Sequence, residues 1–304
     1  MAISAADVKN LREMTGVGMM DCKKALAASD GDIDKAVEWL REKGLAAAQK
    51  KAGRIAAEGV AYATVIDGVG VCLEVNAESD FVAKNDVFVD YVHQVANVVA
   101  KAAPADLDAL MECKYPDSEL TVKEAQNEKV LVIGENINVR RFERFPEGVS
   151  VSYVHMGGKI GVIVNLTTDL DAETVEAVGK DVAMQIAALN PRFWDKSQVT
   201  QDILDEEKKV MLAQMANDPA MANKPEAVRE KIVAGKLNKY YSENCLLQQE
   251  FVKDNTLTVE KYIASAAKAL GGSIAFSGAV RFEKGEGIEK REDDLAAEVA
   301  KLVK

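Results

Sequence analysis

Residues 71–84 read VCLEVNAESDFVAK, and the apolar run in this stretch stops abruptly at Asn76. Before Asn76, apolar residues recur at every second position, which is the period of a strand with one buried face. An apolar helical pattern follows from Phe81 onward, so a short polar turn with Asp80 and Phe81 at its tip joins the predicted strand to a predicted helix. Strand-to-helix turns often carry the working residues of a protein. We therefore expect the rest of the chain to hold this tip in place.

Length and charge limit the classes of protein to consider. The chain has 304 residues, which predicts about two domains with enough apolar residues for a sizeable core. Lys and Arg number 38 against 49 Asp and Glu, a net charge of −11, so the whole-molecule field does not attract nucleic acid or an anionic membrane. The N-terminus lacks a signal-peptide pattern, and no uncharged apolar run approaches the roughly 18 residues of a membrane span. We expect a cytoplasmic protein that contacts neither membrane nor nucleic acid directly.

Motifs for catalysis or metal binding are absent from the sequence. The sequence has four cysteines without a CxxC pair: Cys22, Cys72, Cys113 and Cys245. This usage indicates reduced thiols and neither zinc nor disulfides. No phosphate loop, GxGxxG, HExxH or GxSxG motif occurs. His93 is expected to pack in a helix, and His155 lies at a strand end without an acid or nucleophile near it in sequence. We expect no cofactor, no metal site and no catalytic residues.

The first 43 residues show the pattern of three short helices. Ser4 and Asp7 form a capping box, and TGVG at residues 15–18 ends the first helix. A second helix is predicted over residues 19–28, and a third after the DGD sequence that follows it. Residues 1–43 are thus predicted to form a compact helical module. Its thin apolar content favours docking onto another part of the molecule.

The next stretch, residues 44–57, reads GLAAAQKKAGRIAA and is predicted to be a domain boundary. It combines Ala-rich composition with Lys50, Lys51 and Arg54, which indicates a helical or flexible tether with a local basic face. A solvated linker without further function is the alternative.

An internal repeat is visible when the chain is compared with itself at an offset of 91 residues. The matched pairs are Tyr62 with Tyr153, Gly70 with Gly161, Val71 with Val162, Leu73 with Val164, Asp80 with Asp171, Asp90 with Asp181, Gln94 with Gln185 and Val95 with Ile186. Both copies show a strand, a turn, a second strand and a helix. The sequence therefore predicts two related α+β lobes with antiparallel sheets, one at residues 58–145 and the other at residues 146–197 with 251–284.

The repeat leaves two interpretations open for Asp80 and Phe81. Asp80 and Asp171 both lie where a helix N-cap is expected, so capping alone accounts for Asp80. Phe81 matches Ala172, and a first helical position is usually exposed. Phe81 also fits one apolar helical stripe with Phe88, so burial in the core is the alternative.

The connections between these elements carry weaker patterns. Residues 120–144 predict a helix, a turn at residues 133–136 and a strand, whereas residues 104–118 are expected to be irregular. A last strand is predicted at residues 273–282, where it completes the sheet of one lobe.

Two long helical patterns follow the second copy of the repeat. Residues 198–217 and 226–244 predict two helices around a tight reversal, within a protruding antiparallel arm at residues 198–250. Such an arm buries only one seam, so a partner, a homodimer through the arm and a solvated hairpin all remain open. Residues 285–304 are predicted to be a C-terminal module with an amphipathic helix at residues 291–304.

Several motifs resemble those of the elongation factor Ts family, the guanine-nucleotide exchange factors of elongation factor Tu. TGVGMMDCKKAL at residues 15–26 and LEVNAESDFVAK at residues 73–84 are similar to the two signatures of the family. IGENINVRR, KIGVIV, FVKD and RFEKGEGIEK follow in the expected order, so the resemblance covers nearly the whole chain. Ala77 and Ser79 replace residues more usual in the second signature, but they flank the Asp-Phe pair without altering it.

The resemblance implies a ubiquitin-associated-like helical domain, a two-lobed core, a coiled-coil arm and a C-terminal module. It implies a protein without its own catalytic chemistry that binds elongation factor Tu, both GDP-bound and nucleotide-free, and promotes GDP release. In the family, the residues at Asp80, Phe81, Val82 and Ala83 enter the GTPase domain of the partner near its magnesium site, with Phe81 as a wedge. The other implied contacts are Met19, Met20, Lys23, Lys51, Ile133, Gly134, His155, Val252 and Lys253.

Two other classes of function remain open on the sequence alone. A scaffold or chaperone-like protein, suggested by the helical module and the arm, would bind a partner without accelerating nucleotide release. An enzyme acting on a small molecule would need a pocket with perturbed titratable groups, and the sequence offers no pair for it.

Overall fold

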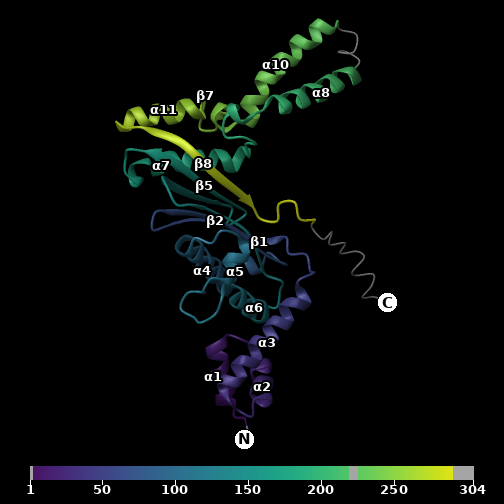
Figure 1. Ribbon diagram of the computed structural model, residues 1–304, viewed down its shortest axis with the longest axis vertical. Coiled ribbons are helices and arrows are strands. Elements are labelled where there is room, and N and C mark those ends of the chain that lie inside the picture. The colour runs from purple at the N-terminus through teal and green to yellow at the C-terminus, as the bar shows by residue number, and fades with distance from the viewer. Residues whose placement is uncertain (1–2, 219–224, 290–304) are drawn as a thin grey trace.

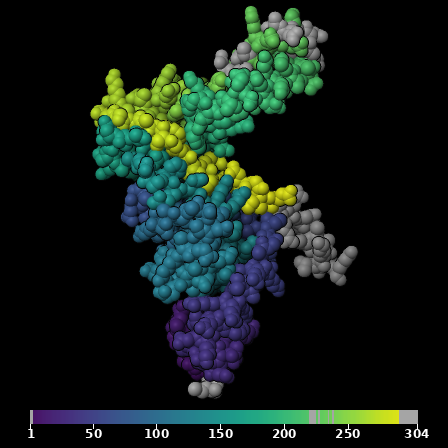
Figure 2. Space-filling model, in the orientation of Figure 1, coloured from purple at the N-terminus to yellow at the C-terminus, as the bar shows by residue number. Residues whose placement is uncertain are grey.

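The computed structural model describes residues 3–218 and 225–289. The molecule is elongated, with a helical module at one end, two stacked lobes in the middle and a helical arm that projects from the other end (Figures 1 and 2). Helices and antiparallel sheets are both present, so the predicted α+β class is confirmed. Among the described residues, no helix has the length and apolar character needed to cross a membrane.

The helical module consists of three helices: α1 (Ala5–Thr15), α2 (Met19–Ala28) and α3 (Ile33–Lys51). The predicted capping box of Ser4 and Asp7 is confirmed, and Gly16 ends α1 in the left-handed region with a φ of 68°. Asp32 caps α3 by accepting a hydrogen bond from the Lys35 N–H. The three helices enclose a small apolar core around Leu11 and Leu26.

The third helix is longer than predicted. We expected a tether from residue 44 onward, but α3 continues unbroken to Lys51, so the helical alternative holds for residues 44–51. Gly44 is buried where α3 packs against the helix at residues 122–133, so closely that a Cβ there would lie only 3.1 Å from the backbone oxygen of Asn127. Leu131 and Val132, which follow on the same neighbouring helix, pack against the core of the module. The module is therefore docked on the first lobe through a rigid helix.

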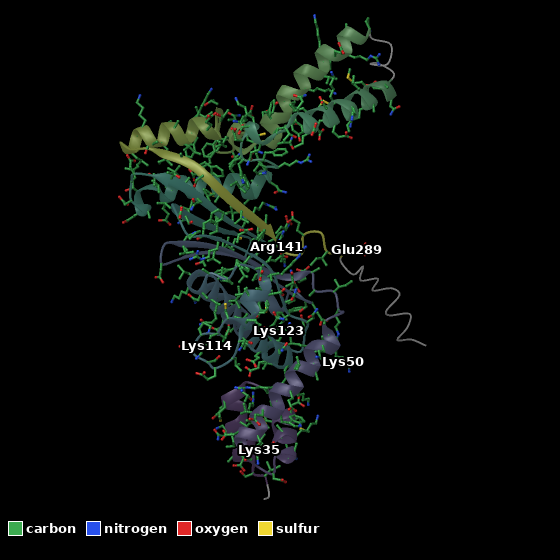
Figure 3. All side chains as sticks on the ribbon, viewed as in Figure 1. Lys35, Lys50, Lys114, Lys123, Arg141 and Glu289 are labelled. Carbon is green, nitrogen blue, oxygen red and sulfur yellow. The ribbon has the colours of Figure 1, made fainter. Side chains whose placement is uncertain are left out.

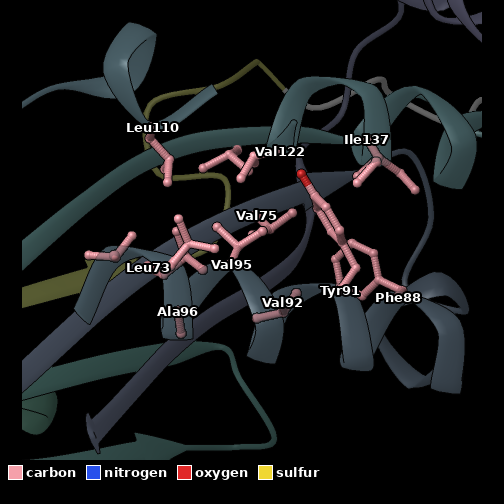
Figure 4. Packing of buried hydrophobic residues seen from close by; sticks show 14 of the residues in the cluster. Leu73, Val75, Phe88, Tyr91, Val92, Val95, Ala96, Leu110, Val122 and Ile137 are labelled. Atoms are coloured by element: carbon pink, nitrogen blue, oxygen red, sulfur yellow. The ribbon is translucent and has the colours of Figure 1, made fainter. Parts of the chain in front are cut away.

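The first lobe is a three-stranded antiparallel sheet of order β1-β2-β3, covered on one face by helices. Its elements are β1 (Glu58–Ile66), β2 (Val69–Ala77), the short 3-10 helix η1 (Val82–Lys84), α4 (Asp86–Ala102), α5 (Leu107–Glu112), α6 (Val122–Ile133) and β3 (Asn138–Phe145). Leu73 and Val75 of β2 pack against Val92 and Val95 of α4 in a closely filled core (Figure 4).

One helix of this lobe lies in a stretch that we expected to be irregular. Helix α5 forms within residues 104–118, where the Asp106 side chain caps it by accepting a hydrogen bond from the Ala109 N–H at 2.8 Å. The buried Leu110 attaches α5 to the core of the first lobe. A six-residue helix is too short to show a clear helical period, which is why the pattern did not predict it.

The second lobe repeats this plan with a strand from the end of the chain. Its elements are β4 (Val149–His155), β5 (Ile160–Thr168), α7 (Ala172–Leu189), the short 3-10 helices η2 (Lys196–Gln198) and η3 (Leu246–Gln248), β6 (Glu250–Phe251), β7 (Asp254–Thr258), α11 (Val259–Leu270) and β8 (Ile274–Glu283). The main sheet has the order β4-β5-β8, so the prediction that the last strand completes a lobe sheet is confirmed.

The 91-residue repeat is confirmed in the strand register. Strands β2 and β5 coincide end to end at this offset, and β1 and β4 begin at matching positions. The pairing of β2 with β3 shifts register between Glu74 and Val75, and the pairing of β5 with β8 shifts register between Asn165 and Leu166. These two places are also 91 residues apart, so the two central strands share even this irregularity of pairing.

The arm is formed by α8 (Gln201–Asn217) and α10 (Glu226–Asn244), which run antiparallel and protrude from the second lobe (Figure 1). Both predicted helices of the arm are thus present. Its base is fixed by a small apolar cluster that includes Val199, Tyr240 and Cys245. The predicted C-terminal helix at residues 291–304 lies outside the described residues.

Candidate functional site

The predicted tip lies in an eight-residue loop, residues 78–85, between β2 and α4. Helix α4 begins at Asp86, and its cap is Asn85, whose Oδ1 accepts a hydrogen bond from the Val87 N–H at 2.9 Å. The prediction that Asp80 caps this helix is therefore wrong. In the second copy, Asp171 does cap α7, because it accepts from the Thr174 N–H at 2.9 Å. The first copy replaces the first turn of that helix with the loop and η1.

Phe81 is exposed on this loop, with 84% of its surface accessible to solvent. The next residue, Val82, is only 5% exposed and packs into the core of the first lobe. Phe81 therefore does not share the buried stripe of α4, and the alternative of a core role for it is wrong. Asp80 is also exposed, whereas Ala83 is half-buried against the same core. The loop thus presents an acidic and an aromatic side chain together to solvent.

A glutamate from another turn fixes the start of the loop. Glu135 lies in the turn between α6 and β3, 56 residues away in sequence. Its Oε2 accepts from the Ser79 N–H at 2.9 Å, and its Oε1 accepts from the Ser79 hydroxyl at 2.6 Å. Both oxygens of one carboxylate therefore hold one residue of the loop.

A second glutamate, in the loop itself, contacts the α6–β3 turn. Glu78 Oε1 accepts a hydrogen bond from the Asn136 N–H at 2.6 Å and lies 3.4 Å from the Arg54 guanidinium. The Asn136 side-chain amide in turn donates to the Arg54 carbonyl at 2.9 Å. The loop, the α6–β3 turn and the chain that follows α3 are thereby joined at one point.

Three predicted contact residues gather around this point. Gly134 ends α6 in the left-handed region with a φ of 87°, directly before Glu135, and Ile133 is the last residue of that helix. Lys51 donates from Nζ to the Val130 carbonyl at 3.4 Å, near the same end of α6. Burial, and then the charge of Arg54, lower the pKa of Lys51. Lys51, Ile133 and Gly134 therefore flank the loop that carries Phe81.

The other predicted contact residues lie elsewhere. Met19, Met20 and Lys23 are exposed on α2 of the helical module. In the second lobe, His155 is the last residue of β4, and Val252 and Lys253 form the turn between β6 and β7. The predicted residues thus fall into three groups on the module, the first lobe and the second lobe, and the structure does not bring them into one pocket.

The residues of the second-lobe group have definite partners. His155 Nδ1 lies 2.8 Å from the Tyr153 hydroxyl. Lys253 pairs with Asp181 at 2.6 Å, whereas Val252 has an exposed side chain and donates its N–H to buried Gln185 at 2.8 Å. The last two contacts tie the β6–β7 turn to α7 and leave the Val252 side chain accessible.

A protein-family model described as Elongation factor TS matches residues 78–286, well over half of the chain. The chain belongs to the elongation factor Ts family. The elongation factor Ts of Syntrophotalea carbinolica is 47% identical to this chain over 307 residues, and the comparison covers 100% of both chains. Those of Clostridium kluyveri and Halothermothrix orenii are each 48% identical, with at least 99% of both chains covered. The resemblance seen in the sequence motifs is thereby confirmed.

One groove formed by the described residues has no carboxylate in its lining. The groove between α3, α6 and the start of β3 has a volume of about 530 Å³, and its titratable lining residues are the cations Arg54, Lys123 and Arg140. In the ranges 3–218 and 225–289, no cluster of three or more His, Cys, Asp or Glu residues could hold a metal ion. His93 is exposed on α4, with its ring 4.7 Å from that of Tyr62.

Sequence reasoning missed the residues that hold the loop. Glu78, Ser79, Glu135 and Asn136 were not among the predicted site residues, although Glu135 and Asn136 lie in the quoted motif IGENINVRR. The usable signal was a pair of glutamates, each in a turn beside a predicted contact. Pairing across 56 to 58 residues is set by the sheet, and no local pattern predicts it.

Proposed function

We propose that this protein promotes nucleotide exchange on elongation factor Tu by inserting Phe81 near the magnesium and phosphate site of its partner. The coarser part of this function, nucleotide exchange for elongation factor Tu in translation elongation, follows from membership of the elongation factor Ts family. The observation that supports the finer part is the exposure of Phe81, which is 84% accessible although it lies next to a core residue. We expect the protein to act in the cytoplasm and to have no catalytic chemistry of its own.

The proposed mechanism follows from the way in which a GTPase holds GDP. The phosphates rest on backbone N–H groups at a helix N-terminus, and Mg²⁺ bridges phosphate and protein oxygens. A wedge at Phe81, with Asp80 beside it, displaces groups that hold the magnesium ion. Loss of this ion removes the largest positive charge beside the phosphates, so GDP leaves faster and GTP can bind.

The energy of this wedge is of the required order. Burial of a Phe side chain contributes about 1.5 to 3 kcal/mol, and couplings between two binding sites are typically about 1 to 3 kcal/mol. Burial of Phe81 is thus large enough to supply much of the distortion. Orientation of the two proteins would come from the further contacts at the residues of α2, the α6–β3 turn and the second lobe named above. Coupling is reciprocal, so GDP weakens the binding of this protein by the same factor and allows turnover.

The test is stopped-flow release of a fluorescent GDP analogue from elongation factor Tu, with and without this protein. We expect Phe81→Ala to reduce the acceleration about 10-fold or more, since a loss of about 1.4 kcal/mol corresponds to a factor of ten. Leu189→Ala removes another exposed apolar side chain, at the end of α7, and serves as the matched control with unchanged acceleration. Binding without acceleration by the unmodified protein would instead support the scaffold class.

A further inference from the structure

In the first lobe, each of two turns contributes a glutamate that accepts a backbone hydrogen bond from the other turn. The loop after β2 contributes Glu78, which accepts the backbone N–H of Asn136 in the other turn at 2.6 Å. The α6–β3 turn contributes Glu135, which accepts the backbone N–H of Ser79 at 2.9 Å and its hydroxyl at 2.6 Å. We call these four residues the glutamate clasp. Hydrogen bonds to an ionised carboxylate are about twice as strong as those between neutral groups, so the clasp is a strong local restraint.

The clasp lies immediately before the exposed tip. Glu78 and Ser79 are half-buried, Asp80 and Phe81 are exposed, and Val82 returns to the core. Phe81 therefore lies two positions after the clasped Ser79 and one position before the buried Val82. A side chain that is ordered before binding loses less conformational freedom on insertion than one on a loose loop.

We propose that Glu135 is a positioning residue for nucleotide exchange, which holds the Asp80–Phe81 tip in its inserting conformation through Ser79. This inference rests on the proposed function, because it assigns a role in the action of Phe81. Glu135 acts through the backbone of the loop. Glu78 completes the clasp from the other side and ties it to the chain after α3 through Arg54 at 3.4 Å.

Glu135→Gln is the sharpest probe of this role. The amide keeps the shape of the side chain but offers one acceptor oxygen and one NH₂ group, and the NH₂ group cannot accept from either Ser79 donor. Ser79→Ala removes only the hydroxyl contact, whereas Ser79→Thr keeps both donors. The matched control is Glu176→Gln, which removes a carboxylate from an exposed ion pair with Lys180 at 2.6 Å on α7.

The first measurement tests the clasp itself in the full chain. Hydrogen–deuterium exchange followed by mass spectrometry reports on peptides spanning residues 78–82. We expect Glu135→Gln to raise the hydrogen-exchange rate of residues 78–82 about 10-fold, because a half-buried hydrogen bond to a charged group is lost. Glu176→Gln should leave this rate unchanged. An unchanged hydrogen-exchange rate of residues 78–82 in Glu135→Gln would overturn the proposal.

The second measurement tests positioning through GDP release from elongation factor Tu. We expect Glu135→Gln to lower the maximal release rate about 5- to 10-fold, with less than a twofold change in the concentration of this protein needed for half-saturation. Ser79→Ala should lower the maximal rate about 2- to 3-fold, and Ser79→Thr should restore it. In a Phe81→Ala background, Glu135→Gln should change the rate less than twofold, since both residues act through one wedge.

The outcomes separate this inference from the proposed function. A 5- to 10-fold loss of the maximal GDP release rate on adding Glu135→Gln to Phe81→Ala would overturn the positioning role while leaving nucleotide-exchange activity established. An unchanged maximal rate in Glu135→Gln, with faster hydrogen exchange, would do the same. If the unmodified protein does not accelerate GDP release, the proposed function fails and the positioning role fails with it, while hydrogen exchange still decides whether the clasp orders the loop.

Discussion

At the scale of the residue, two neighbours in the chain have opposite surroundings. Phe81 is exposed and Val82 is buried, whereas the sequence pattern left exposure and burial both open for Phe81. The loop backbone causes this difference, because η1 turns Val82 toward the core and leaves Phe81 outside. The function proposed for Phe81 and the packing of Val82 thereby belong to adjacent side chains, which mutation can separate.

Val82→Ala should lower the free energy of unfolding by about 2 kcal/mol, because two methyl groups leave a close-packed core. Phe81→Ala should change it by less than about 0.5 kcal/mol, since an exposed side chain loses few contacts. Urea unfolding followed by circular dichroism checks both values. A loss of stability in Phe81→Ala as large as that in Val82→Ala would contradict the exposure of Phe81.

A buried carboxylate shows why some residues of the site could not be predicted. Glu74 alternates with apolar residues in the predicted strand, a pattern of one buried face, but its side chain is fully buried. Burial works to raise its pKa, and hydrogen bonds from Asn76, the Gly285 N–H and Arg140 outweigh burial and lower the pKa. Arg141 pairs with Glu74 at 2.6 Å and lies beside the chain that leads to Glu289 (Figure 3). Like the glutamate clasp, this network joins distant segments, and periodicity contains no information on such pairs.

At the scale of the element, the strands were predictable and several boundaries were not. Alternation and the repeat predicted β2 and β5, because a two-residue period with one buried face is a strong local signal. The end of α3 was missed, since Gly44 is a poor helix former that is tolerated only for its close contact with Asn127. The start of α4 was misplaced, because the loop that replaces its first turn is held by Glu135 from another turn.

The base of the arm illustrates how one side chain joins two short elements. Asp195 caps η2 by accepting from the Ser197 N–H at 2.9 Å, and it also accepts from the Gln248 side chain of η3 at 2.9 Å. The Lys196 N–H donates to the same Gln248 at 2.9 Å. Hydrogen bonds from Ser197, first through its side chain, and from Gln248 lower the pKa of Asp195 to about 2. The two segments that lead into and out of the arm are thus linked by a carboxylate.

Asp195→Asn should therefore destabilise the protein in a pH-dependent way. The folded pKa lies below the ordinary value of 3.8, so the contribution of Asp195 is complete above about pH 4 and is lost as the pH falls toward about 2. The melting temperature of the variant should lie below that of the unmodified protein by a constant difference from pH 7 to pH 5. That difference should shrink between pH 4 and pH 3. A difference independent of pH over the whole range would show that the charge of Asp195 is not involved.

At the scale of the whole molecule, the two lobes meet through reciprocal contacts. Their sheets pack face to face around a small apolar cluster that includes Ala61, Cys72 and Ile163. The Cys72 thiol contacts the Gly161 carbonyl at 3.6 Å, and Ile163, which matches Cys72 in the repeat, lies against Gly70, which matches Gly161. Each copy thus offers the other the same pair of positions, as two subunits do in a symmetric dimer. The repeat therefore explains the joining of the lobes as well as their fold.

Glycine at these positions sets how closely the sheets approach. A Cβ on Gly161 would lie 2.9 Å from the backbone oxygen of Ala61, an atom that cannot turn away as a flexible side chain could. We expect Gly161→Ala to lower the free energy of unfolding by about 1 to 3 kcal/mol, the usual cost of overpacking. Gly235→Ala in α10 is the control, because a Cβ there meets no atom within 4 Å and Ala favours the helix by up to about 1 kcal/mol. Urea unfolding measures both. Since the proposed contacts Phe81 and Val252 belong to different lobes, Gly161→Ala should also weaken binding to elongation factor Tu, and undiminished affinity would contradict the contact proposed for the second lobe.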